Sequence, residues 1–143
     1  MKRLLILTVW CAGLPSALAA PVNMEPGLWE ITIQSKMAGM PEGMPQAGKH
    51  TVRQCITPDE TADARKIIRT QPGCQFDKLD TQSNHVRWKM RCKTPEGSST
   101  SEGEMTYAGQ SYQGTLVHST VMEGQTLRTT QTMQGRRVGP CKK

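Results

Sequence analysis

Apolar and polar residues alternate along much of the chain, the pattern of strands that bury one face and expose the other. After a Pro-Gly turn, residues 28–36 (LWEITIQSK) place Trp29, Ile31 and Ile33 on one side. A second strand is expected at 50–56 (HTVRQCI), beyond a loop rich in Met, Gly and Pro. The first part of the chain is therefore predicted to form two strands.

A helix is expected directly after the second strand. Thr57 can cap its N-terminus, Pro58 suits the first turn, and Glu60 completes a capping box. Acidic residues come first and basic residues last, as the helix dipole prefers. The prediction is one short helix from Pro58 to about Arg69, ended by the Gln-Pro-Gly run that follows.

From Cys74 onward the pattern predicts a β-meander. The expected strands cover residues 74–80, 86–92, 104–108, 111–121 and 126–134, with a loop at 95–99. A sheet of about seven strands would curl to bury its apolar side and limit its exposed edges. The predicted fold is mainly β: a small antiparallel meander curled into an open or closed barrel, with the short helix inserted after the second strand.

Composition limits the core of this sheet. Leu, Ile, Val and Phe supply 16 of the 124 residues from Ala20 onward. Such a small core suggests a domain that needs covalent support, and Met, Trp, Tyr and Thr must fill its interior. The length of 143 residues fits one domain and excludes a large multi-domain enzyme.

The first residues read as a secretory signal peptide. Met1–Arg3 is basic, residues 4–12 (LLILTVWCA) are apolar, and Ala17–Ala19 is an A-x-A cleavage site. A membrane anchor is the alternative, but the apolar run is much shorter than the roughly 20 residues that span a bilayer. We therefore expect residues 1–19 to be removed, leaving a single domain at 20–143 that is periplasmic or secreted and does not span the membrane.

Four cysteines remain after that cleavage and are expected to form two disulfides. If residues 82–84 form a three-residue turn, Thr81 faces His85 and Cys74 lies opposite Cys92. Cys55 would then pair with Cys141. The rival pairing is Cys55–Cys74 with Cys92–Cys141, and a zinc site is disfavoured because no C-x-x-C pair occurs.

Aromatic and methionine side chains stand in for a dense aliphatic core, which suggests a pocket. The candidate ligand-lining residues are Trp29, Trp88, Met90, Tyr107 and Tyr112. In the loop between the first two strands, Met37, Met40 and Met44 offer thioethers of the kind that bind Cu(I). Coverage of an irregular apolar gap is the alternative role for these methionines.

Other chemistry finds little support. His50, His85 and His118 lack metal-ligand spacing, and no nucleophile motif is present. The basic residues between the apolar positions of 86–92, with those near the C-terminus, suggest a solvated strand face; a patch for anionic envelope components is the alternative. Aromatic residues do not interleave with these bases, so nucleic-acid binding is not expected.

Several separated motifs resemble those of the bacterial exported proteins grouped as domain-of-unknown-function family number 3617. In order they are PGLWE at 26–30, QCITPDE at 54–60, VRWKMRC at 86–92 and GRRVGPC at 135–141. The resemblance implies export and a small disulfide-bearing β domain. It carries over no catalytic or ligand residue.

The sequence as a whole predicts a non-enzymatic exported β protein that needs no cofactor. We expect it to bind a small apolar ligand or an envelope partner. A Cu(I)-binding periplasmic module is the alternative, and an enzyme without a recognisable motif is a third possibility.

Overall fold

The computed structural model describes residues 21–39, 43, 45, 47–69, 72–95 and 97–142. Within these, the chain forms seven strands and two short helices. They are β1 (Gly27–Ala38), β2 (Ala47–Ile56), α1 (Pro58–Thr61), α2 (Ala64–Ile68), β3 (Cys74–Gln82), β4 (His85–Thr94), β5 (Gly97–Tyr107), β6 (Ser111–Met122) and β7 (Gln125–Gly139).

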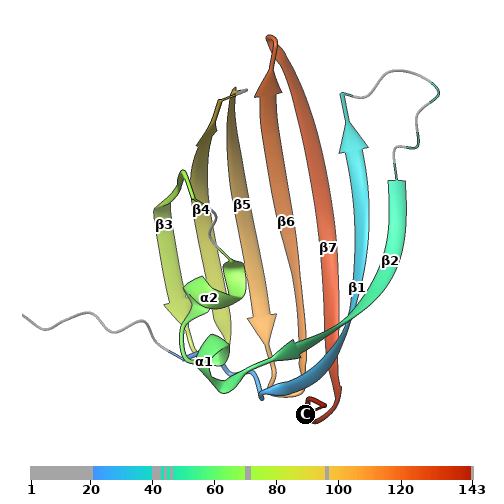
Figure 1. Cartoon of the computed structure of the whole chain (residues 1–143), viewed down its shortest axis with the longest axis vertical. Coiled ribbons are helices and arrows are strands. Elements are labelled where there is room, and N and C mark those ends of the chain that lie inside the picture. Colours follow the sequence, from blue (N-terminus) through green and yellow to red (C-terminus); the bar gives the residue numbers. More distant parts are fainter. Residues whose placement is uncertain are drawn as a thin grey trace, which may run out of the picture.

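The seven strands form one antiparallel sheet in the order β2-β1-β7-β6-β5-β4-β3. The sheet does not close, so β2 and β3 are its two edges (Figure 1). The predicted fold class is confirmed, in its open form. Strand β1 pairs with its sequence neighbour β2 on one side and, along residues 28–38, with the last strand β7 on the other.

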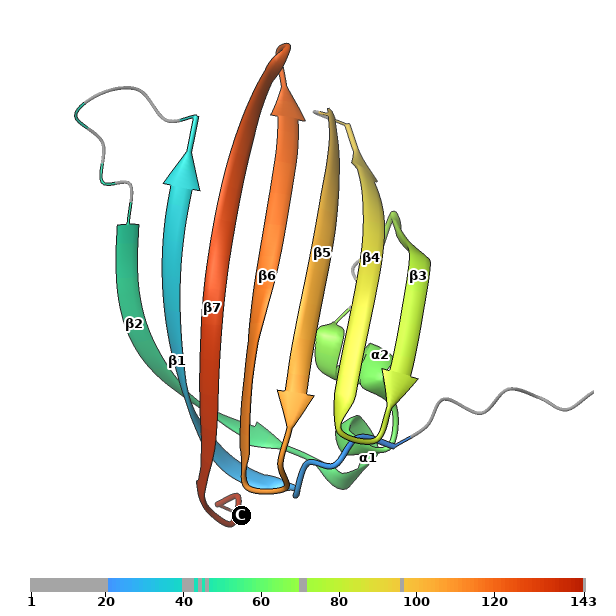
Figure 2. The same ribbon diagram turned by 180° about the vertical axis from the view of Figure 1, so that it is seen from behind.

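The helices lie on one face of the sheet, which we call the inner face (Figure 1), and the outer face carries none of them (Figure 2). The inner face carries the apolar side of each strand. Its buried members from the sheet are Trp29, Ile31, Ile56, Val86, Trp88, Met90, Met105 and Tyr107. Trp29 and Val86 are fully buried, so the core lies between the inner face and the helical segment.

Strand β5 is longer than its pattern predicted. The expected loop at 95–99 is wrong from Gly97 onward, because residues 97–103 pair with β4 on one side and residues 98–103 pair with β6 on the other. This stretch is rich in Ser, Thr and Gly, residues with no apolar alternation to mark a strand. Pairing on both sides satisfies its backbone regardless of composition.

The helical segment forms two helices instead of one. Its start is confirmed: the capping box joins the Thr57 and Glu60 side chains and backbone reciprocally. The helix stops after Thr61 because Asp63 adopts an extended backbone (φ −144°) and its carboxylate accepts a 2.9 Å hydrogen bond from the Arg65 N–H. Asp63 is thus the N-cap of a second helix.

The β3–β4 hairpin turns on two residues rather than three. Gln82 faces His85, so the predicted Thr81–His85 pair is wrong at the turn. A bulge at Asp77 then shifts the register by one residue. The shift brings Cys74 opposite Cys92, and both expected disulfides, Cys74–Cys92 and Cys55–Cys141, are confirmed.

Candidate functional site

Two adjoining cavities occupy the inner face beneath and beside the helices. The lower cavity, of about 230 Å³, lies between α2 and the sheet. The upper cavity, of about 430 Å³, lies toward the disulfide that joins β3 and β4. Both are lined by Ile68, Arg69, Trp88 and Leu116. The two hollows are therefore parts of one site.

The lower cavity has mostly apolar walls. Its apolar lining includes Ile31, Ile33, Ile67, Met105, Leu116 and Met133. The segment before β1 closes its lower end: Met24 lines the cavity, and Val22 beside it donates its N–H to the Thr61 carbonyl at 3.1 Å. Apolar walls of this kind favour an apolar group over water.

The upper cavity has a mixed lining. Trp88, Met90 and Leu116 form its apolar wall. Beside this wall, on β5 and β6, the lining includes Ser99, Ser101, Thr120 and His118, with Ser101 paired to Met90 across the β4–β5 ladder. Arg69 is the one side chain of fixed charge among its described lining residues. The site therefore changes from apolar to polar along the strands.

Glycines on the inner face allow large side chains to lie flat against the sheet. Gly103 lies opposite Trp88 in the β4–β5 ladder, and a β-carbon at residue 103 would overlap the indole ring. Gly114 leaves room for Met105, and Gly135 leaves room for Tyr112, in the same way. These side chains cover the backbone instead of standing up into the cavities.

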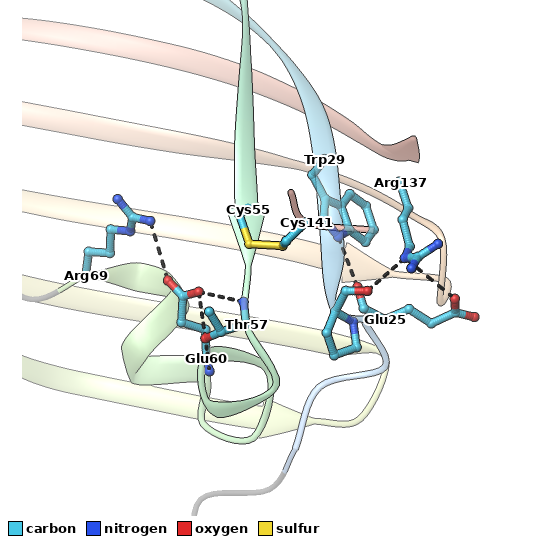
Figure 3. Close-up of a disulfide and its surroundings, with 9 residues drawn as sticks. Glu25, Trp29, Cys55, Thr57, Glu60, Arg69, Arg137 and Cys141 are labelled. Carbon is cyan, nitrogen blue, oxygen red and sulfur yellow. Dashed lines mark hydrogen bonds and ion pairs between the residues drawn. A yellow bond between two sulfur atoms is a disulfide. The ribbon is translucent and has the colours of Figure 1, made fainter. Parts of the chain in front are cut away.

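Arg69 is positioned at the mouth of the site by two contacts. It is the C-cap of α2, with a left-handed backbone (φ 54°) and an N–H bonded to the Arg65 carbonyl. Its guanidinium lies 3.5 Å from Glu60, whose other carboxylate oxygen accepts the Thr57 N–H at 2.8 Å (Figure 3). The Thr57 N–H bond, with the nearby Arg69 charge, lowers the pKa of Glu60. Glu60 is thus an anion that orients Arg69.

The aromatic side chains of the lower end form a cluster in which the rings are tilted against one another. Tyr112 lies 5.6 Å from Trp29 and 6.0 Å from Tyr107 between ring centroids. Burial raises the pKa of Tyr112 to about 12 and raises that of Tyr107 further. Both hydroxyls therefore stay neutral near pH 7, and neither is suited to act as a base.

The predicted ligand-lining residues fall into two groups. Trp88, Met90, Tyr107 and Tyr112 all line one or both cavities. Trp29 is fully buried and is not among the lining residues; its indole N–H donates to the Glu25 carbonyl at 3.0 Å (Figure 3). Trp29 therefore packs beneath the site and supports it.

Sequence reasoning missed a polar cluster in the upper cavity. His118 accepts or donates at both ring nitrogens: Nδ1 lies 2.8 Å from the Ser101 hydroxyl, and Nε2 lies 3.0 Å from the Thr120 hydroxyl. The signal was present, because Ser101 has the same strand parity as Met105, and His118 has that of Leu116. Within the described part of the chain, every buried side-chain nitrogen or oxygen has a partner.

The methionine loop falls largely outside the described residues. Met40 and Met44 lie there, and Met37, at the end of β1, is 37% exposed. Among the residues that the structure describes, no three His, Cys, Asp or Glu side chains gather as a metal site. The Cu(I) alternative stays a prediction.

The basic face of β4 is compensated by acids on neighbouring strands. Arg87 lies 3.3 Å from Glu104, Lys89 lies 2.7 Å from Glu102, and Arg91 lies 2.6 Å from Asp77. All three pairs are on the outer face and at least partly exposed, where such pairs contribute little to stability. The charges balance locally, as a solvated strand face requires.

The outer face also carries a hollow of about 560 Å³, which is lined from β1, β7, β6 and the end of β5. Its walls include Thr32, Gln113 and Gln134 and the ion-paired Glu30 and Arg136. It is more open to solvent than the inner cavities, and an ion pair lies in its wall. We therefore place the candidate site on the inner face.

No helix in the described residues is long and apolar enough to cross a membrane. No curated protein and no solved structure matches the chain significantly. A family model described as a protein of unknown function, DUF3617, matches residues 24–141. That match covers all seven strands, both helices and all four paired cysteines. The chain therefore belongs to the DUF3617 family.

Proposed function

We propose that this protein binds a small, largely apolar molecule in the two adjoining cavities of the inner face, without catalysing a reaction on it. The observation that carries the proposal is the apolar inner face of an open sheet, covered only in part by α1 and α2. The upper cavity's volume falls in the range of about 300–1,000 Å³ that is usual for small-molecule sites.

The glycine pairs support binding in preference to a purely structural role. Trp88, Met105 and Tyr112 lie over Gly103, Gly114 and Gly135, and all three side chains line the lower cavity. A sheet selected for packing alone gains stability by filling such space, because voids in a core are destabilising.

We also propose that the protein works in the periplasm or outside the cell, after loss of residues 1–19. The two disulfides support this location, because structural disulfides form and persist in oxidising compartments. The basic, apolar and A-x-A sequence of the leader supports it independently.

The test is a binding titration with N-phenyl-1-naphthylamine, a neutral apolar dye that fluoresces when it leaves water. We expect saturable binding to the full chain folded with both disulfides. Leu116→Trp should fill the shared wall of the two cavities and weaken binding at least tenfold. Val117→Trp, the adjacent residue on the outer face, is the matched control and should leave binding unchanged.

Two results would overturn the proposal. One is a wild-type protein that does not bind the dye. The other is equal weakening by the two tryptophan variants, which would place the dye elsewhere on the molecule.

A further inference from the structure

We infer that the ligand is a single-chain amphiphile with an anionic head group, such as a long-chain carboxylate. Its tail would lie in the lower cavity, and its head would meet Arg69 and the Ser101–His118–Thr120 cluster of the upper cavity. This inference rests on the proposed function, and it adds the chemical class and the orientation of the ligand.

The polarity of the site sets the orientation. The lower cavity is lined by Ile31, Ile33 and Met133 along the strands. β5 and β6 also line the lower cavity, through Met105 and Leu116. Toward the upper cavity, polar residues follow on these two strands: Ser101 lies beyond Gly103 on β5, and His118 and Thr120 lie beyond Leu116 on β6. A wholly apolar ligand would place carbon against the Arg69 guanidinium and the hydroxyls of this end, whereas an amphiphile can hydrogen-bond there and bury its tail in the lower cavity.

Charge selects an anion over a cation. In the upper cavity, Arg69 is the single fixed charge among the described lining residues, and none of those residues is a carboxylate. Glu60 lines the lower cavity but is engaged by Thr57 and, at 3.5 Å, by Arg69. One long contact uses one of the five N–H donors of a guanidinium, so Arg69 retains donors for a carboxylate.

The histidine cluster supplies a further donor in either neutral tautomer. A neutral imidazole donates through one nitrogen and accepts through the other. The hydroxyl that accepts from the N–H of His118 keeps its own hydrogen, and this hydroxyl is Ser101 in one tautomer and Thr120 in the other. One hydroxyl hydrogen is therefore available to an oxygen of the head group.

The experiment compares three probes with the same twelve-carbon chain: dodecanoate, 1-dodecanol and dodecyltrimethylammonium. Each displaces N-phenyl-1-naphthylamine from the full, oxidised chain at concentrations below micelle formation. We expect dodecanoate to bind about tenfold more tightly than dodecanol, as a charge-assisted hydrogen bond implies, and the cation to bind most weakly.

Arg69→Gln should remove the preference of dodecanoate over dodecanol, because the loss of affinity should be much larger for the carboxylate than for the alcohol. Arg53→Gln is the matched control, because Arg53 is equally exposed and also paired to a glutamate, but on the outer face. It should leave all three affinities unchanged. Melting temperatures of the two variants show that both are folded.

The outcomes separate this inference from the proposed function. Equal binding of the three probes, or an unchanged preference in Arg69→Gln, overturns the anionic head group while an apolar site stands. Failure of all three probes and of the dye overturns the proposed function itself.

Discussion

Trp88 lies directly opposite Gly103 across the β4–β5 ladder, and its indole occupies the space that a β-carbon at residue 103 would need. The same indole lines both inner cavities. A missing side chain on one strand therefore sets the position of a large one on the next, and with it the shape of the site.

Gly103→Ala is expected to lower the free energy of unfolding by about 1–3 kcal/mol, because the added methyl group must displace a buried ring. Urea unfolding followed by circular dichroism measures the change. Gly48→Ala on β2 is the control, since its added β-carbon meets no atom within 4 Å. Equal stability of the two variants would show that the ring moves aside at no cost.

The two disulfides should contribute unequally to stability. Cys55–Cys141 closes a separation of 86 residues and Cys74–Cys92 one of 18. The loss of conformational entropy in the unfolded chain should stabilise the folded protein by about 4–5 kcal/mol for the first disulfide and about 3 kcal/mol for the second. Guanidinium unfolding of the two double-serine variants gives the comparison. If removal of Cys74–Cys92 lowers the free energy of unfolding more than removal of Cys55–Cys141, the stabilisation does not come from the entropy of the unfolded chain.

Stability should fall in acid partly through Glu60. Its pKa is lowered in the folded protein, first by the Thr57 N–H, from an ordinary value of 4.5. Its contribution is therefore complete above that value and is lost as the pH falls through the lowered pKa. Glu60→Gln keeps a capping oxygen but carries no charge. The free energy of unfolding of this variant should therefore decline less than that of the wild type between pH 5 and pH 2. Urea unfolding curves, measured at about two to three pH values per pH unit, give the comparison.

Glu123→Gln is the control for that comparison, because Glu123 lies in the turn between β6 and β7, outside the capping box. An identical acid response in Glu60→Gln and the wild type would remove Glu60 from the account of acid sensitivity.

Tryptophan fluorescence should report occupancy of the site. Trp88 lines both cavities, whereas Trp29 is fully buried beneath them. We expect dodecanoate to shift or quench emission in the wild type and in Trp29→Phe. Trp88→Phe should lose that response. A response that persists without Trp88 would place the ligand away from the inner face.

Local patterns predicted local structure well. Alternation at Trp29 and Ile31 located β1, and Thr57 with Glu60 located the start of α1. The Cys74–Cys92 pair was predicted from a register that fails at the turn and succeeds at the cysteines, because the bulge at Asp77 offsets the shorter turn. A bulge depends on pairing across strands, and periodicity within one strand does not reveal it.

The candidate site was predictable only in its apolar half. Aromatic and methionine residues indicated a pocket, but His118 was read as isolated because its partners are distant in sequence. Ser101 lies 17 residues away, across the β5–β6 ladder. Predicting such a contact requires knowledge of how β5 and β6 are aligned. The first half of β5, residues 97–103, has no apolar alternation, so the sequence did not indicate a strand there.

The position of β1 beside β7 determines how the order of the strands in the sheet relates to their order in the sequence. Read from one edge to the other, the strands run β3, β4, β5, β6, β7, β1, β2. This is the order of a simple meander whose first two strands have been moved to the front. The start of β1 and the end of β7 already meet, since the Arg137 side chain donates to the Pro26 carbonyl at 2.8 Å (Figure 3). A circular permutant joined there and opened between α1 and α2 would make every strand pair consecutive, lowering contact order and speeding folding.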